Sequence, residues 1–332
     1  MVKTSRTEAL DYGKVLTNIV NGTAKYLTDN KIKVCVLGIS GGIDSTVTAA
    51  ICKLVFEKID VPLIGISLPC STNKNDEKSA ASLVGAEFCN EFKEVNLQMP
   101  FEMMEKFCAE TSGTDSTPIS QGNIKARLRM ITLYDIASKR GGIVIDTDNL
   151  TEQFLGFWTL HGDQADFNPI GGLWKHEVYG LAKYLKSEVF KDSKALEASI
   201  ALMPTDGNGV KDGGDLAQIA EGKTYDDVDD ILYHWVNLSD NIKPKYASDG
   251  LTDSIKNTIF DVEDEDVKKR RLEYCEKSGK EFVPNLGDKY GVDTIRNVCM
   301  RSVRSEFKRR QQPFVVDIFN GKILEKNGEI IA

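Results

Sequence analysis

The sequence has few of the features that mark membrane, secreted or metal-clustered proteins. No apolar run approaches the roughly 20 residues that a membrane-spanning helix needs. The first residues, MVKTSRTEALDYGKVL, contain no apolar core of a secretory signal. The seven cysteines lie far apart, without the C-x-x-C spacing of a zinc site or a redox pair. We therefore expect a cytoplasmic protein whose cysteines are reduced.

Basic residues are also fewer than acidic ones. The 42 lysine and arginine residues are outnumbered by 50 aspartate and glutamate residues, which gives a formal net charge of −8. This balance opposes loose attachment to the phosphate backbone of a nucleic acid, and the basic runs at 268–271 and 308–310 are local exceptions. We expect neither a nucleic acid nor a membrane among the partners of this chain.

The hydrophobic residues follow the pattern of an α/β protein, in which short β-branched runs alternate with longer segments of helical period. The expected strands are Lys33–Ile39, Val61–Leu68, Phe92–Leu97 and Ile143–Ile145. The expected helices are Thr46–Phe56, a helix capped by Asp76, and Gln121–Arg140, which would end at Gly141. Right-handed crossovers predict a doubly wound parallel sheet flanked by helices, with ligands beyond the carboxyl ends of its strands.

No internal repeat and no low-complexity linker divides the chain, so we predict a single domain over residues 1–332. The composition changes after Trp235, because Asn237–Tyr290 is polar and charged. We expect this segment to be a mostly helical insertion near the C-terminus of the fold. Close to the end of the chain, Pro313–Ile318 and Lys322–Leu324 predict a small hairpin.

The stretch VLGISGGIDSTV, Val36 to Val47, places a glycine-rich turn between a strand and a helix. Such a turn directs backbone N–H groups and the helix dipole at an anion. Gly41 and Gly42 permit close approach of a ligand, and Asp44 can hold Mg²⁺ against phosphate oxygens. The stretch matches neither the Walker A loop nor the dinucleotide fingerprint. Because it has no loop lysine, we expect it to bind a pyrophosphate that leaves intact.

The SGGIDS loop resembles that of the N-type ATP pyrophosphatases, whose fold is adenine-nucleotide alpha-hydrolase-like. Later segments, in the same order, resemble the ammonia-dependent NAD synthetases: GNIKARLRM from Gly122, TDNLTEQFLGFWTLHGD from Thr147, NPIGGLWKHEVYGLAKYL from Asn168, PTDG from Pro204 and YDDVDDIL from Tyr225. The resemblance covers Leu27–Trp235 and a short tail, Arg304–Pro313. It leaves Asn237–Tyr290 unexplained.

The resemblance implies a reaction in two steps. ATP adenylates the nicotinate carboxylate of deamido-NAD, and ammonia then attacks the NAD-adenylate to give NAD and AMP. It also implies a homodimer with the dinucleotide near the interface. No cysteine has a convincing histidine and acid partner in a separate domain, so we expect no built-in glutaminase. Ammonia would come from solution or from another protein.

The resemblance also assigns roles to individual residues. Three would be catalytic: Asp44, Lys175 and Asp163, the last as the acid that binds ammonium and helps to deprotonate it. Asp44 and Glu152 would hold Mg²⁺. The expected ATP contacts are Gly38, Ile39, Ser40, Gly41, Gly42, Ile43, Asp44, Ser45, Thr147, Lys175 and Thr205. The expected deamido-NAD contacts are Arg127, Asp166, Phe307 and Lys308.

Three positions depart from the family pattern. Leu160 stands where the family usually has lysine, and Phe307 where it has histidine, so two polar contacts to deamido-NAD are lost. Asp146 replaces the glycine of the usual Gly-Thr-Asp triplet. These departures leave open a second hypothesis, an adenylating ligase with another acceptor. A third hypothesis, a nucleotide-binding module without turnover, is disfavoured because it would need neither Glu152 as a metal ligand nor Asp163 as a proton acceptor.

Overall fold

Four parallel strands form the central sheet of the protein, whose computed structural model describes residues 10–202, 216, 219–238, 265–309, 315–316 and 323–324. The strands are β1 (Cys35–Gly38), β2 (Leu63–Ser67), β3 (Glu91–Glu94) and β4 (Ile143–Ile145), in the spatial order β3-β2-β1-β4. The sheet confirms the predicted α/β class. Because the strand order reverses between β1 and β4, the expected ligand crevice lies at the carboxyl ends of these two strands.

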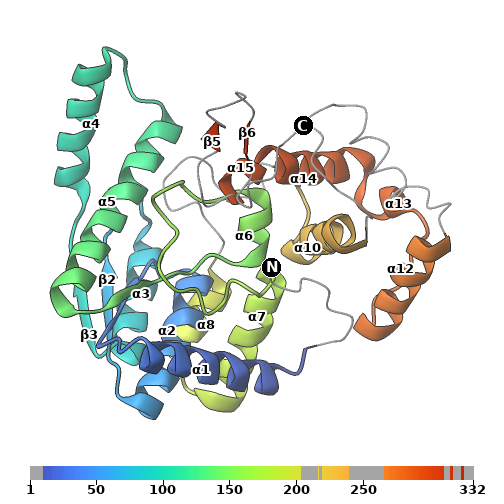
Figure 1. Cartoon of the computed structure of the whole chain (residues 1–332), viewed down its shortest axis with the longest axis horizontal. Helices are drawn as coiled ribbons and strands as arrows, with labels where there is room; N and C mark the ends of the chain where they lie inside the picture. Colours follow the sequence, from blue (N-terminus) through green and yellow to red (C-terminus); the bar gives the residue numbers. More distant parts are fainter. Residues whose placement is uncertain are drawn as a thin grey trace.

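Successive residues of β1 point to opposite faces of the sheet and meet different helices. Cys35 and Leu37 lie in one apolar core, whereas Val36 lies in another. The first core is covered by α1 (Tyr12–Asp29), α2 (Ile43–Ile59), α3 (Asn75–Phe88), α7 (Lys175–Tyr184) and α8 (Lys194–Ala201). The second is covered by α4 (Gln98–Ser112) and α5 (Pro118–Arg140), which project together at one side of the molecule in Figure 1. Burial on both faces explains why β1, β2 and β4 are apolar runs, whereas β3 lies at the edge of the sheet and is largely exposed.

Several helix boundaries differ from the predicted ones. Helix α2 begins at Ile43 rather than Thr46, because Gly42 takes the N-cap position, and this places Asp44 in its first turn. Asp76 lies in the first turn of α3 and is not its cap, which is Lys74. Helix α4 was not predicted at all. Helix α5 ends as predicted, at Gly141 with a φ of 66°.

A second group of helices packs beside the sheet. The members are α6 (Leu150–Leu155), α10 (Tyr225–Tyr233), α12 (Glu265–Ser278), α13 (Leu286–Tyr290), α14 (Val292–Arg304) and α15 (Glu306–Arg309). Val228 and Ile231 of α10 and Ile295 and Val298 of α14 are fully buried in the shared core. The described part of the expected insertion is mostly helical, since it contains α12 and α13, and residues 279–285 connect them without a helix. The single-domain assignment stays a prediction.

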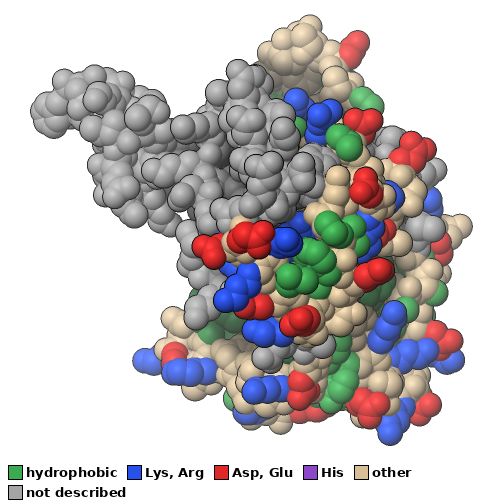
Figure 2. All heavy atoms as spheres, turned by 90° about the vertical axis from the view of Figure 1, so that its right-hand side faces the viewer, with side chains coloured by type: hydrophobic (Ala, Val, Ile, Leu, Met, Phe, Trp, Pro, Cys, Tyr) green, Lys and Arg blue, Asp and Glu red, His purple; other side chains and the backbone are tan. Residues whose placement is uncertain are grey.

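The basic run at 268–271 is divided between surface and interior. Lys268 and Lys269 are exposed, whereas Arg271 is 1% exposed and donates to Pro284 O at 3.0 Å. On the face that Figure 2 shows, lysine and arginine side chains alternate with aspartate and glutamate side chains. Arg271 is therefore a structural residue of this segment.

Smaller features complete the architecture. The predicted hairpin is confirmed, because β5 (Val315–Val316) pairs antiparallel with β6 (Ile323–Leu324). Two short π-helices, η1 (Leu185–Val189) and η2 (His234–Leu238), extend α7 and α10. All seven cysteines lie in the described part of the chain and form no disulfide. Among the helices that the structure describes, none is long and apolar enough to cross a membrane.

Candidate active site

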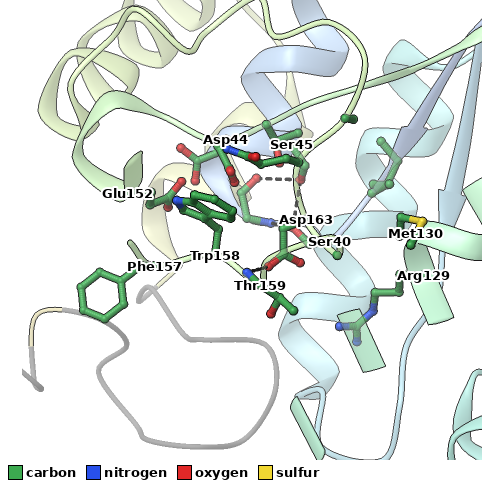
Figure 3. Close-up of a pocket in the computed structure, with 18 of the residues that line it drawn as sticks. Ser40, Asp44, Ser45, Arg129, Met130, Glu152, Phe157, Trp158, Thr159 and Asp163 are labelled. Atoms are coloured by element: carbon green, nitrogen blue, oxygen red, sulfur yellow. Dashed lines mark hydrogen bonds between the residues drawn. The ribbon is translucent and has the colours of Figure 1, made fainter. Parts of the chain in front are cut away.

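The SGGIDS loop joins β1 to α2 and is shaped by its glycines and serines. Gly41 has a φ of 84°, and a Cβ atom there would lie 2.4 Å from Glu77 O, so a glycine is required. The hydroxyl oxygens of Ser40 and Ser45 lie 3.0 Å apart (Figure 3), and Ser45 Oγ donates to Gly42 O. The loop therefore presents the N-terminus of a 17-residue helix to the cavity, an arrangement that favours phosphate oxygens.

Three charged side chains, distant in the sequence, meet beside this loop. Lys175 Nζ donates to Asp44 Oδ2 at 2.5 Å and to Glu152 Oε1 at 3.0 Å, and Figure 3 shows the two acids near each other. The Lys175 side chain is 6% exposed and each carboxylate 17%. Desolvation opposes the charge on Lys175, but attraction by the two acids outweighs it and raises the pKa of Lys175 well above its usual value. Lys175 is therefore a cation held between two anions.

The chain that follows β4 holds these charges in place. Asn149 caps α6 by accepting from Glu152 N, and its Nδ2 donates to Asp44 Oδ1 at 3.0 Å. Thr151 Oγ1 accepts from Lys175 N at 2.8 Å, which joins the start of α6 to the start of α7. Each of the three charged residues is thus attached to one short segment, 149–152.

Asp163 lines the same cavity, on the loop that follows α6, and lies near Ser40 and Trp158 in Figure 3. Thr159 N donates to its Oδ2 at 2.5 Å. The cavity leaves Asp163 accessible to solvent, but the carboxyl group lies deep among protein atoms, and this burial raises its pKa. Lys308 Nζ supports the same loop by donating to Gly156 O at 2.7 Å and to Trp158 O.

The departure at Asp146 has a structural explanation. Its side chain is buried and accepts from Asp148 N at 2.7 Å and from Ala165 N at 2.9 Å. Burial raises the pKa of Asp146 to about 6. Asp146 therefore ties the end of β4 to the loop that carries Asp163, a link that a glycine side chain cannot make.

A cavity of about 640 Å³ joins these groups and extends along α5. Most of the predicted site residues line it: Gly38, Ile39, Ser40, Gly42, Ile43, Asp44, Ser45, Thr147, Glu152, Asp163, Lys175 and Lys308. Gly41 shapes the loop without lining the cavity. Thr205 and the side chain of Phe307 lie outside the described residues.

Two of the predicted deamido-NAD contacts point elsewhere. Arg127 is exposed, does not line the cavity, and donates through Nη2 to Leu160 O at 3.1 Å. Asp166 does not line the cavity either, because its carboxylate accepts from Val144 N at 2.9 Å and from Tyr134 Oη at 3.1 Å. In this arrangement both residues stabilise the Asp163 loop.

The sequence reasoning missed a stripe of cavity-lining residues on α5: Ile119, Gly122, Asn123, Arg129, Met130, Leu133 and Tyr134. These positions recur at helical spacing, so the signal was present once the phase of the helix was known. Arg127 lies outside the stripe, whereas Arg129 lies in it and donates to Leu68 O at 3.2 Å. Burial lowers the pKa of Arg129.

A parallel sheet with its nucleotide-type loop at the switch point, and with an acid–lysine–acid group beside it, defines an adenine-nucleotide alpha-hydrolase-like protein. The family model for NAD synthase matches residues 15–273, and the chain belongs to this family. The resemblance found in the sequence is therefore confirmed.

Individual relatives agree with the family. The NH(3)-dependent NAD(+) synthetase of Campylobacter jejuni subsp. jejuni is 33% identical over 177 residues, which are 53% of this chain and 69% of the relative. That of Lactobacillus johnsonii is 33% identical over 233 residues, 67% of this chain and 80% of the relative. The structure of NMN synthetase from Francisella tularensis shares the fold, with a TM-score of 0.66 and 23% identity, over 94% of this chain and all of the other.

Proposed function

We propose that this protein catalyses the ATP-dependent amidation of deamido-NAD by ammonia, with NAD, AMP and pyrophosphate as products. The observation that carries the proposal is the meeting of Asp44, Glu152 and Lys175 at the N-terminus of α2. Family membership and the relatives' names support the same reaction. The nicotinate carboxylate would attack the α-phosphorus of ATP and release pyrophosphate. Ammonia would then attack the activated carbonyl carbon and release AMP.

The donor set beside the loop fits Mg²⁺. Asp44 and Glu152 are hard oxygen donors, and their carboxylates converge on a single cationic group, Lys175 Nζ. In the described part of the chain no cluster offers three or more histidine, cysteine or acidic ligands, so phosphate oxygens and water would complete the shell. When bound, the ion neutralises charge on the phosphates, and Lys175 adds a second positive charge beside them.

Asp163 has the properties of the proton acceptor for ammonium. It is an acid in the same cavity as Lys175, and its raised pKa brings it closer to a proton-transfer role at neutral pH. Asp148 also lines the cavity, but burial raises its pKa well above the ordinary value, so Asp163 and not Asp148 is the acid that we assign to ammonium.

The exposed face of α4 and α5 supports a homodimer. Large apolar side chains stand in solvent there: Met99 (68% exposed), Met103 (67%), Phe107 (63%), Ile119 (67%) and Ile131 (56%). Met99, Met103 and Phe107 recur every fourth position and therefore share one side of α4, and exposed apolar side chains gathered in this way are typical of a protein–protein contact. Ile119 also lines the cavity, so a second copy on this face would lie beside the acceptor.

A shorter acceptor is the second candidate. The positive groups expected at deamido-NAD already have partners within the protein, because Arg127 donates to Leu160 O and Lys308 donates to Gly156 O. Leu160 itself supplies no charge. Nicotinate mononucleotide carries the same carboxylate and phosphate but lacks the AMP half, and the identical chemistry would amidate it.

The test is to supply ATP, Mg²⁺ and ammonium with each acceptor in turn and to measure AMP and the amide together. Equal amounts of AMP and NAD from deamido-NAD, at higher kcat/KM than with the mononucleotide, would support the proposal. Preference for the mononucleotide would favour the shorter acceptor. Binding of ATP without AMP release for either acceptor would contradict both, in favour of a nucleotide-binding module.

A further inference from the structure

Two of the three charged site residues lie at the N-termini of two different helices. One buried acid, Asp229, contacts both of these N-termini. Glu152 lies in the first turn of α6, and Lys175 is the first residue of α7. Asp229, on α10, is 1% exposed and contacts Thr151 and His176, which adjoin Glu152 and Lys175 in the sequence. It touches neither reacting group.

The contacts form a short chain of hydrogen bonds. Thr151 Oγ1 donates to Asp229 Oδ1 and accepts from Lys175 N at 2.8 Å. His176 N donates to Asp229 Oδ2 at 2.9 Å, and His176 Nδ1 lies 2.8 Å from the same oxygen. Because a carboxylate offers two oxygens in a fixed plane, Asp229 sets the separation of the two helix starts.

We propose that Asp229 is a positioning residue that holds Glu152 and Lys175 at the separation at which both meet Asp44. This inference rests on the proposed function and adds a part of the machinery outside the cavity. Small displacements of aligned charges have large effects on binding and rate. Loss of the Asp229 link should therefore weaken Mg²⁺-dependent ATP binding, although Asp229 itself contacts no ligand.

Asp230, the next residue of the same helix, provides a matched control. Its side chain is 4% exposed, and it accepts from Tyr290 Oη at 2.6 Å, Tyr274 Oη at 3.2 Å and Lys280 Nζ at 2.9 Å. These partners belong to the α12 and α13 segment. Asp230→Asn thus removes a buried charge from α10 without disturbing the helix starts at the site.

The experiment compares Asp229→Asn, Asp230→Asn, Thr151→Val and Thr151→Ser. The readouts are ATP binding by calorimetry with and without Mg²⁺, kcat, both KM values and Tm. We expect Asp229→Asn and Thr151→Val to weaken Mg²⁺-dependent ATP binding and to lower kcat by about tenfold or more each. Thr151→Ser, which keeps the hydroxyl group, should restore both, and KM for the acceptor should change least.

Asp230→Asn should lower Tm without changing ATP binding. The proposal is overturned if Asp229→Asn and Asp230→Asn lose ATP binding in proportion to their loss of Tm, or if Thr151→Val binds ATP as the native protein does. Because ATP binding is measured without an acceptor, a native protein that binds ATP but forms no amide would contradict the proposed function alone.

Discussion

Replacing Lys175 with methionine removes the ammonium group between the Asp44 and Glu152 carboxylates and keeps most of the aliphatic side chain. The two acids would then face each other with a low exposure of 17% each. Removing one partner from a buried ion pair costs about 3–5 kcal/mol. Because both acids keep some contact with solvent, we expect the free energy of unfolding to fall by an amount near the lower end of this range, about 3 kcal/mol.

Mg²⁺ should partly reverse this loss. Without the ammonium group, the two carboxylates offer an anionic oxygen pair with no competing cation, so the variant should bind Mg²⁺ more tightly than the native protein in the absence of ATP. Binding to the folded state alone stabilises it by about 2.7 kcal/mol at a ligand concentration of 100 times Kd. Activity should stay low at every Mg²⁺ concentration, since the proposed mechanism also needs the charge of Lys175 beside the phosphates.

Thermal unfolding with increasing Mg²⁺ is the assay, and Lys139→Met is the control. Lys139 Nζ also lies 2.5 Å from a carboxylate, that of Asp135, but the two side chains are 71% and 55% exposed. Such a pair contributes at most about 1 kcal/mol. If Lys175→Met unfolds at the same temperature as Lys139→Met, and Mg²⁺ affects both alike, then Lys175 does not lie between two ionised acids.

Three further predictions concern other parts of the molecule. Phe107→Glu places a charge on the apolar α4 and α5 face and should convert a dimer to monomers in analytical ultracentrifugation, whereas a native protein that is already monomeric would refute the interface. Burial lowers the pKa of His234 to about 4. Between pH 6.5 and 4 the unfolded state therefore binds a proton that the native state does not bind, and the free energy of unfolding falls as pH falls through this window. His234→Gln should remove this loss of about 3 kcal/mol from denaturation curves measured across the window, and an unchanged pH dependence would contradict it. Leu160→Lys should leave KM for either acceptor within a few-fold of native, because Leu160 does not line the cavity, and a large fall in KM would show that the residue reaches the substrate.

Strands β1, β2 and β4 were predictable because their residues are largely buried. The apolar run around Val36 needs no partner information to be identified as a strand. Helix α4 was missed for the opposite reason: Phe101 is its buried residue, and Met99, Met103 and Phe107 are exposed, so its pattern is not that of a helix covering a core. The start of α2 was misplaced because the N-cap is a glycine, which gives a weaker signal than serine or aspartate.

The sequence named most of the residues beside the SGGIDS loop but not the contacts between them. Lys175 and Asp44 are separated by 131 positions, and no local pattern indicates that they touch. Asp229 could be found only from the packing of α10 on α6 and α7, since nothing local distinguishes the buried acid among the four aspartates of the segment DDVDD. Resemblance supplied the reacting residues, whereas tertiary contacts were needed for the groups that position them.

Of the three departures from the family pattern, Leu160 lies in the loop 156–166, which carries Asp163. Asp146 is hydrogen-bonded to this loop, whereas Phe307 lies on α15. Arg127 holds this loop through Leu160 O, Asp146 holds it through Ala165 N, and Asp166 holds it through Val144 N. Lys308 adds contacts to its first residues. Three residues expected at deamido-NAD, namely Arg127, Asp166 and Lys308, thus fix the backbone around Asp163. Asp44, Glu152 and Lys175, which the resemblance assigns to the ATP side, contact one another beside the SGGIDS loop. Differences from the relatives should therefore appear in the affinity for the acceptor and not in the adenylation step.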